Sequence, residues 1–371
     1  MKRVIMAAAL TLTTSAISGQ LISIEASPQS ETVVLASGKS IETRTLDTFF
    51  QNATREAAIP GLSFAFINDG RIVYQTVAGR RDLVDERPVT SETIFEAASL
   101  SKPLFGAFVV HLAERGVIDI DQPLIELYPH PDLDDDPRSG RFTARMVLSH
   151  QTGLPNWRSD LADGDLAILF EPGSRHSYSG EAYEYLADVL MHTMALDDEG
   201  LDQHFAKWLA KPLDLRATTF IQSDETLGNK AKGYRKGEQV KGNVDYRIAE
   251  FGAAHSVHTD AVNYAKAMIG LMQGNVLSDE GRKAFLKPQS VVIPADHPQR
   301  PLGLSDWALG FSVYETPMGQ FYVHGGNNRG FTSLAAINPQ QAWGFVIMTN
   351  EDQADQFLQS VIAVLLGLAD I

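Results

Sequence analysis

The chain carries the stretch FEAASLSKP at Phe95–Pro103, in which Ser99 stands three residues before Lys102. Residues three apart share one face of a helix, so this spacing predicts that the lysine amine lies close to the serine hydroxyl. A free serine hydroxyl is a poor nucleophile and needs a base beside it. No other Ser-x-x-Lys pair occurs in the chain. The stretch therefore predicts a nucleophilic serine with a lysine as its neighbour at the start of a helix.

Hydrophobic periodicity on both sides of this stretch predicts a sheet whose strands come from the two ends of the chain. Residues 45–57 have a helical pattern, and apolar runs at 62–67 and 72–77 flank the hairpin turn Asn68-Asp69-Gly70. Later runs predict four strands and a final helix, at 308–314, 320–323, 333–337, 343–348 and 357–368. The middle of the chain is mostly helical in pattern. We expect an α+β fold, an α/β sandwich with an antiparallel sheet plus an inserted all-helical lobe.

The N-terminus predicts export. Met1-Lys2-Arg3 is basic, the residues up to Ile17 are mostly apolar or small, and Ala16-Ile17-Ser18 offers a cleavage site. We expect a signal peptide at 1–18, a flexible lead-in at 19–44 and one domain at 45–371. Within that domain, 45–115 and 250–371 would form the sheet lobe and 116–249 the helical lobe. Because the chain has no cysteine, the expected compartment is a bacterial periplasm, where disulfides are permitted but not required.

Composition excludes several classes of partner and cofactor. The formal net charge is −15, which repels phosphate backbones and anionic lipid, so nucleic acid is not expected as a partner. The apolar N-terminal run is too short for a stable membrane span. The absence of cysteine removes thiolate ligands, and no His-Glu-x-x-His motif occurs, so we expect no metal or other cofactor. The expected partner is a small-molecule substrate, and the oligomeric state stays open.

Two further segments carry chemistry-bearing residues at predicted element boundaries. Tyr178-Ser179-Gly180 precedes a predicted helix, and His324-Gly325-Gly326 follows the apolar residues of a predicted strand. Together with Phe95–Pro103, and in this order, the segments resemble the three motifs of the serine β-lactamase/penicillin-binding-protein superfamily. The resemblance is to the class C β-lactamase and family VIII esterase branch, and it covers about residues 45 to 365. It implies a β-lactamase/transpeptidase-like fold.

The resemblance also implies roles for individual residues. Ser99 would attack a substrate carbonyl, and either Lys102 or Tyr178 would accept its proton, a choice that the sequence leaves open. The backbone N–H groups of Ser99 and Asn327 would stabilise the oxyanion. Gly325 and Gly326 would let the substrate approach the strand edge closely. His150 neighbours Ser149, but adjacent residues do not share a helix face, so we expect His150 to have a structural role behind the site.

Departures from the family pattern indicate the substrate. Gly180 replaces an asparagine, and His324 replaces the lysine of many β-lactamases; histidine is mostly neutral near pH 7. We therefore expect a serine hydrolase, an esterase or amidase acting on carboxylic esters or small amides and peptides, including those with D-amino acid parts. The alternatives are a β-lactamase or DD-peptidase, and a catalytically silent member that binds cell-wall peptide. Two more residues complete the expected substrate site: Arg329, as a cation for a substrate carboxylate, and Trp157, as a core aromatic or a pocket wall.

Overall fold

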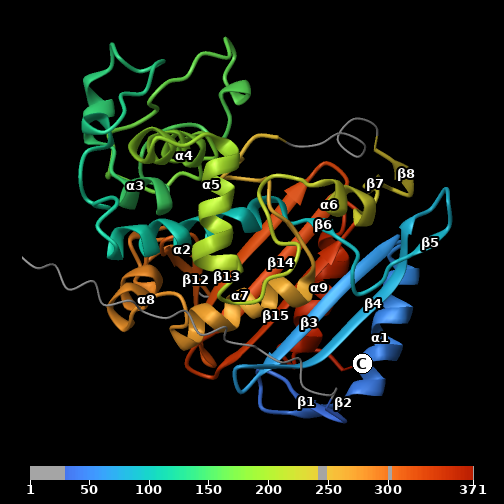
Figure 1. Ribbon diagram of the computed structural model, residues 1–371. Coiled ribbons are helices and arrows are strands. Elements are labelled where there is room, and N and C mark those ends of the chain that lie inside the picture. Colours follow the sequence, from blue (N-terminus) through green and yellow to red (C-terminus); the bar gives the residue numbers. More distant parts are fainter. Residues whose placement is uncertain (1–29, 241–248, 300–302, 371) are drawn as a thin grey trace, which may run out of the picture.

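The computed structural model describes residues 30–240, 249–299 and 303–370. The predicted signal peptide and the first part of the expected lead-in lie outside these residues. The boundaries of the two lobes stay predictions, although the described residues do place a helix-rich segment between two sets of strands (Figure 1).

A nine-stranded antiparallel sheet forms the centre of the molecule (Figure 1). Its strand order is β10-β11-β12-β13-β14-β15-β3-β4-β5. The early strands are β3 (Gly61–Asn68), β4 (Arg71–Asp82) and β5 (Arg87–Pro88). The late strands are β10 (Ser290–Val291), β11 (Leu304–Trp307), β12 (Ser312–Thr316), β13 (Gly319–Asn328), β14 (Phe331–Asn338) and β15 (Trp343–Thr349). The pairing of β15 with β3 joins the two sets and confirms the split sheet.

The hairpin between β3 and β4 forms where the sequence predicts it. Asp69 and Gly70 both have positive φ, 49° and 65°. Two positive φ values in a two-residue loop match the right-handed twist of the flanking strands, which is why Asp-Gly is favoured there.

Each face of the sheet is covered by helices. Along β3, Phe64 and Phe66 point to one face and Ala65 and Ile67 to the other, as strand geometry requires. The first face packs against α1 (Thr43–Glu56) and α9 (Asp355–Leu365). The opposite face packs against α2 (Ser101–Glu114) and α7 (Ala261–Gln273), and α8 (Asp279–Leu286) packs beside α2 (Figure 1).

The inserted segment contributes four helices and one small strand pair among the described residues. Its helices are α3 (Ala144–Leu148), α4 (Glu181–Met194), α5 (Asp198–Phe205) with a π-helical continuation at Ala206–Ala210, and α6 (Asp224–Asn229). A hairpin of β7 (Tyr234–Arg235) and β8 (Glu238–Gln239) follows. Separately, β6 (Phe95–Glu96), just before Ser99, pairs with β9 (His258–Thr259). The regular elements of the insert are therefore mostly helices, joined by long loops, together with one short hairpin.

Two expectations need correction. Part of the predicted flexible lead-in forms a hairpin of β1 (Thr32–Val34) and β2 (Ser40–Glu42). Its Val33 is buried in the core beneath α1 and α9, and this burial opposes the entropy of a free chain. The strand predicted at 308–314 is also wrong in its first half. A turn interrupts it at Gly310, whose φ is +111°, so β11 ends before the turn and β12 begins after it.

Within the described part of the chain, no helix combines the length and apolar character needed to cross a bilayer.

Candidate active site

Ser99 lies in a short 3₁₀ turn, Ala98–Leu100, between β6 and α2. Ala98 has a φ of +51°, a conformation that L-residues rarely adopt. Side-chain hydrogen bonds hold this turn in place. The Ser101 hydroxyl donates to the Ala98 carbonyl (2.6 Å) and accepts from the Val257 N–H (2.9 Å). The turn presents Ser99 half-exposed at the start of α2, while Ser101 is fully buried and structural.

Lys102 lies beside Ser99, as the spacing predicts. Its Nζ donates to Ser99 Oγ (3.3 Å) and to the Ala254 carbonyl (2.9 Å). The side chain is buried, and burial lowers the pKa of Lys102 to about 7, with the negative charge of Glu184 opposing the shift. Near neutral pH a substantial fraction of this amine is therefore uncharged and able to accept a proton.

Tyr178, in the segment before α4, packs against the Lys102 amine. Lys102 Nζ lies 4.6 Å from the centroid of the Tyr178 ring. Burial raises the pKa of Tyr178 well above its usual range, and a hydrogen bond with Ser99 only partly offsets this rise. The phenol therefore stays protonated at neutral pH, which makes it a proton donor in the resting site.

His150 lies behind Tyr178, where the sequence analysis places it. The two ring centroids are 4.2 Å apart, and His150 Nδ1 accepts a hydrogen bond from the Ser179 N–H (3.1 Å). Burial and the neighbouring Lys102 charge lower the pKa of His150. These contacts fix the backbone of the tyrosine segment.

The end of β13 forms the opposite side of the site. β12 pairs with β13 only as far as Val323, so from His324 onward β13 pairs with β14 alone. A Cβ at Gly326 would collide with the Ala97 carbonyl and the Ser333 hydroxyl, so only glycine allows this strand to lie against the serine turn. Asn327, the predicted oxyanion residue, follows on the exposed part of the strand.

His324 is buried, and burial together with the Lys102 charge lowers its pKa to about 3. Its Nδ1 lies 2.7 Å from the Gly325 carbonyl. The side chain is therefore neutral at physiological pH and supplies no positive charge for a substrate carboxylate.

Trp157 lies against Gly180, a contact that the sequence did not reveal. A Cβ at position 180 would lie 2.7 Å from Trp157 Cη2, which is closer than real contacts allow. The indole thus occupies the space that a side chain at this position would need. Trp157 also makes an edge contact with His255 (5.7 Å between ring centroids) and is partly buried, and its role as a pocket wall stays a prediction.

Arg329 is exposed in the turn between β13 and β14. In the described structure it makes no hydrogen bond or ion pair with Ser99, Lys102 or Tyr178. Its role toward a substrate carboxylate stays a prediction.

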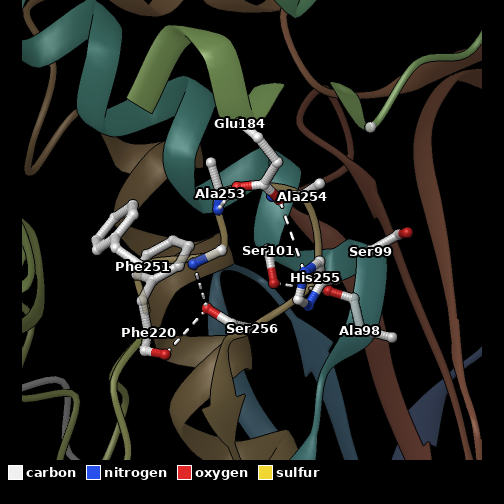
Figure 2. Close-up of polar contacts among 12 residues, drawn as sticks. Ala98, Ser99, Ser101, Glu184, Phe220, Phe251, Ala253, Ala254, His255 and Ser256 are labelled. Atoms are coloured by element: carbon white, nitrogen blue, oxygen red, sulfur yellow. Dashed lines mark hydrogen bonds and ion pairs between the residues drawn. The ribbon is translucent and has the colours of Figure 1, made fainter. Parts of the chain in front are cut away.

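Glu184 and Glu96 are two buried or partly buried acids near the site that the sequence analysis missed. Glu184 on α4 accepts hydrogen bonds from Ala253 N–H and Ala254 N–H (3.0 Å each), as Figure 2 shows. These partners are about 70 positions away along the chain, and no local pattern pairs residues so far apart.

Glu96, three residues before Ser99, is buried and forms an ion pair with the buried Lys230 (2.6 Å between Oε1 and Nζ). Its other carboxylate oxygen accepts a hydrogen bond from Asn328 Nδ2 (2.7 Å). Asn328 directly follows the predicted oxyanion residue, Asn327. Glu96 thus ties the end of β13 to the strand that leads into the serine turn.

The described residues contain no group of three or more His, Asp or Glu side chains arranged to hold a metal ion.

Comparison with known proteins confirms the resemblance over most of the chain. A family model described as Beta-lactamase matches residues 46–367. Protein flp of Staphylococcus aureus (strain MW2) is 21% identical over 324 residues, which cover 82% of this chain and 62% of that protein. Esterase EstB of Burkholderia gladioli is 32% identical over 207 residues, covering 48% of this chain and 52% of the esterase. The chain therefore matches less than two thirds of the length of either relative.

A solved structure of the D-amino acid amidase from Ochrobactrum anthropi SV3 has the same fold. It superposes with a TM-score of 0.73 at 17% identity, covering 88% of this chain and 98% of the amidase. The antiparallel sheet and the mixed α and β architecture are thus those of β-lactamase/transpeptidase-like proteins.

Proposed function

Because this chain belongs to the β-lactamase family, we propose that it is a serine hydrolase that forms an acyl-enzyme on Ser99. The observation that carries the proposal is the position of Lys102 Nζ, 3.3 Å from Ser99 Oγ, on a buried amine whose pKa is lowered to about 7. A nucleophile and a base within hydrogen-bond reach are what acyl transfer by serine requires.

In the proposed mechanism, neutral Lys102 accepts the proton of Ser99 as the serine oxygen attacks the substrate carbonyl. The backbone N–H groups of Ser99 and Asn327 stabilise the resulting oxyanion. The Tyr178 hydroxyl then donates its proton to the leaving group and regains one from Lys102. Water attacks the acyl-enzyme in the second half of the reaction, and the same groups move the proton in the opposite direction. The choice of Lys102 as the base, which the sequence leaves open, rests on the opposite pKa shifts of the two groups.

We propose carboxylic esters and small amides, including those with D-amino acid parts, as substrates. A neutral His324 offers no cation to the carboxylate that penicillins carry, and Gly180 offers no carboxamide for a substrate amide. The similarity to Esterase EstB supports ester hydrolysis. β-Lactam hydrolysis and DD-peptidase activity are the second candidate, and family membership is the observation that favours them.

A substrate panel tests this proposal. Purified protein is assayed with p-nitrophenyl acetate, nitrocefin and D-alanyl p-nitroanilide, each beside a Ser99→Ala variant. We expect turnover of the ester or the anilide to exceed that of nitrocefin, and Ser99→Ala to abolish it. If nitrocefin is turned over fastest, the proposed substrate class is wrong and the protein is a β-lactamase. Activity that survives in Ser99→Ala would refute the acyl-enzyme, and an inactive wild type would favour a binding protein.

A further inference from the structure

Glu184 is an acid placed close to the lysine but outside the proposed reaction. Its two carboxylate oxygens each accept one backbone N–H, from Ala253 and Ala254. Figure 2 shows the carboxylate lying over this loop, with Ser101 and the serine turn nearby. The side chain is 29% exposed, and both carboxylate oxygens are engaged by the loop.

The loop held by Glu184 is the one that holds the lysine. The Ala254 residue donates its N–H to Glu184 and accepts, through its carbonyl, a hydrogen bond from Lys102 Nζ (2.9 Å). That carbonyl is the second partner of the amine besides Ser99 Oγ. Displacing the loop would leave Lys102 free to turn away from the nucleophile.

We infer that Glu184 is a positioning residue that fixes the Ala253–Ala254 loop and, through it, holds Lys102 Nζ beside Ser99. The inference rests on the proposed function and adds a residue to it. The Glu184 oxygens accept hydrogen bonds from the loop rather than from Ser99, so its effect passes through the lysine.

The charge of Glu184 should also affect the pH dependence of the reaction, because it acts on Lys102. A carboxylate near an amine favours the charged amine, so Glu184 raises the pH at which Lys102 becomes neutral. The pKa of Glu184 is itself raised to about 7 by burial, so the two groups titrate together. The other titratable groups near the pair are Tyr178, Tyr183, His150, His324, His255 and Asp188. Burial keeps the tyrosines protonated and lowers the pKa of the histidines, and the Asp188 charge acts on Glu184, so Glu184 is the carboxylate that acts on the lysine directly.

Three variants separate positioning from simple structural support. Glu184→Gln removes the charge, Glu184→Asp keeps the charge but shortens the reach, and Asp188→Asn removes a carboxylate one turn further along α4. For each, kcat and KM for p-nitrophenyl acetate are measured from pH 5 to 9, with a circular dichroism spectrum and Tm to confirm folding.

We expect kcat of Glu184→Gln to fall roughly tenfold to a hundredfold with little change in KM, since the base is misplaced while the substrate site is intact. The apparent pKa in the pH profile of this variant should move down by roughly 0.5 to 1 unit, because Lys102 loses its counter-charge. Glu184→Asp should lose kcat while keeping a profile near that of wild type. Asp188→Asn should keep the wild-type kcat, because the Ala253 and Ala254 N–H groups donate to Glu184 and stay bound in that variant.

An unchanged kcat and pH profile in Glu184→Gln would overturn the inference, as would a lower Tm with no kinetic change. If Glu184→Gln does not fold, Glu184→Asp decides: wild-type kcat in that variant refutes positioning. The proposed function fails separately, by activity in Ser99→Ala, whatever the Glu184 variants show.

Discussion

Burial of Lys102 decides the protonation state of the proposed base. Its folded pKa is about 7, so the amine is mostly charged below pH 7 and mostly neutral above it. We expect kcat/KM for p-nitrophenyl acetate to fall about tenfold per unit below pH 7 and to reach a plateau above it. Lys102→Arg, which stays charged, should lower kcat/KM by roughly 10²–10⁴-fold. A flat profile from pH 5 to 9 would exclude the lysine as the base.

The hydroxyl of Tyr178 can be removed without removing its ring. Tyr178→Phe should keep the contact with His150 and a Tm close to that of wild type, while kcat falls roughly 10²–10⁴-fold for loss of the proton donor. The residual activity should still titrate with an apparent pKa near 7, because Lys102 remains. Loss of that titration in the variant would identify the tyrosine, rather than the lysine, as the base.

The close contact between Gly180 and Trp157 predicts coupling between these positions. Gly180→Asn should destabilise the protein by roughly 1–3 kcal/mol, because the new Cβ meets the indole. In a Trp157→Ala background the same change should have a smaller effect on the free energy of unfolding. Urea unfolding of the two single variants and the double variant measures this coupling, and additive effects would show that the indole does not restrict position 180.

At the scale of elements, the buried Glu96–Lys230 pair joins β6 to the residue that follows α6, and Asn328 joins β13 to the same carboxylate. Both side chains are almost fully buried, and Asn328 Nδ2 donates to the same carboxylate. Lys230→Met should destabilise the fold by about 3–5 kcal/mol, since it leaves the buried Glu96 carboxyl without its cation. Glu96→Gln combined with Lys230→Met should recover part of that loss in chemical unfolding. A Lys230→Met variant as stable as wild type would contradict the assigned pair.

The sequence predicted the elements that have a clear local pattern. It did not predict the elements that depend on contacts with residues far away in the chain. The β3–β4 hairpin follows from alternating apolar residues around Asp69-Gly70, and α1, β14 and β15 follow from their own periodicity. The lead-in hairpin is stable because Val33 reaches the core beneath α1 and α9. In the same way, Ser99, Lys102, Tyr178 and His324 came from motifs, whereas Glu184 and Glu96 depend on contacts with residues far away in the sequence.

For the whole molecule, the two faces of the sheet are separate cores, and the serine turn packs with only one of them. Trp343 lies on the other face, 2% exposed, against Phe66, Phe321 and Phe345, and its Nε1 donates to the Val34 carbonyl (3.2 Å). Trp343→Ala should therefore lower stability by about 3–5 kcal/mol while leaving KM unchanged at temperatures where the variant is folded. A changed KM, with stability retained, would mean that the far core shapes the substrate site.

The sheet split in sequence explains why the whole architecture could be predicted only in outline. Alternation predicts strands, but the pairing of β15 with β3 depends on which faces are buried together. Export rests on the N-terminal residues alone and stays a prediction, as do the lobe boundaries.

Covalent labelling of Ser99 tests the central claim most directly. The wild-type protein and Ser99→Ala are incubated with a fluorophosphonate probe, and intact mass and peptide mapping locate the adduct. We predict one adduct per wild-type chain, on the peptide that contains Ser99, and none on Ser99→Ala. A wild type that stays unlabelled, or equal labelling of the two proteins, would contradict a nucleophilic Ser99.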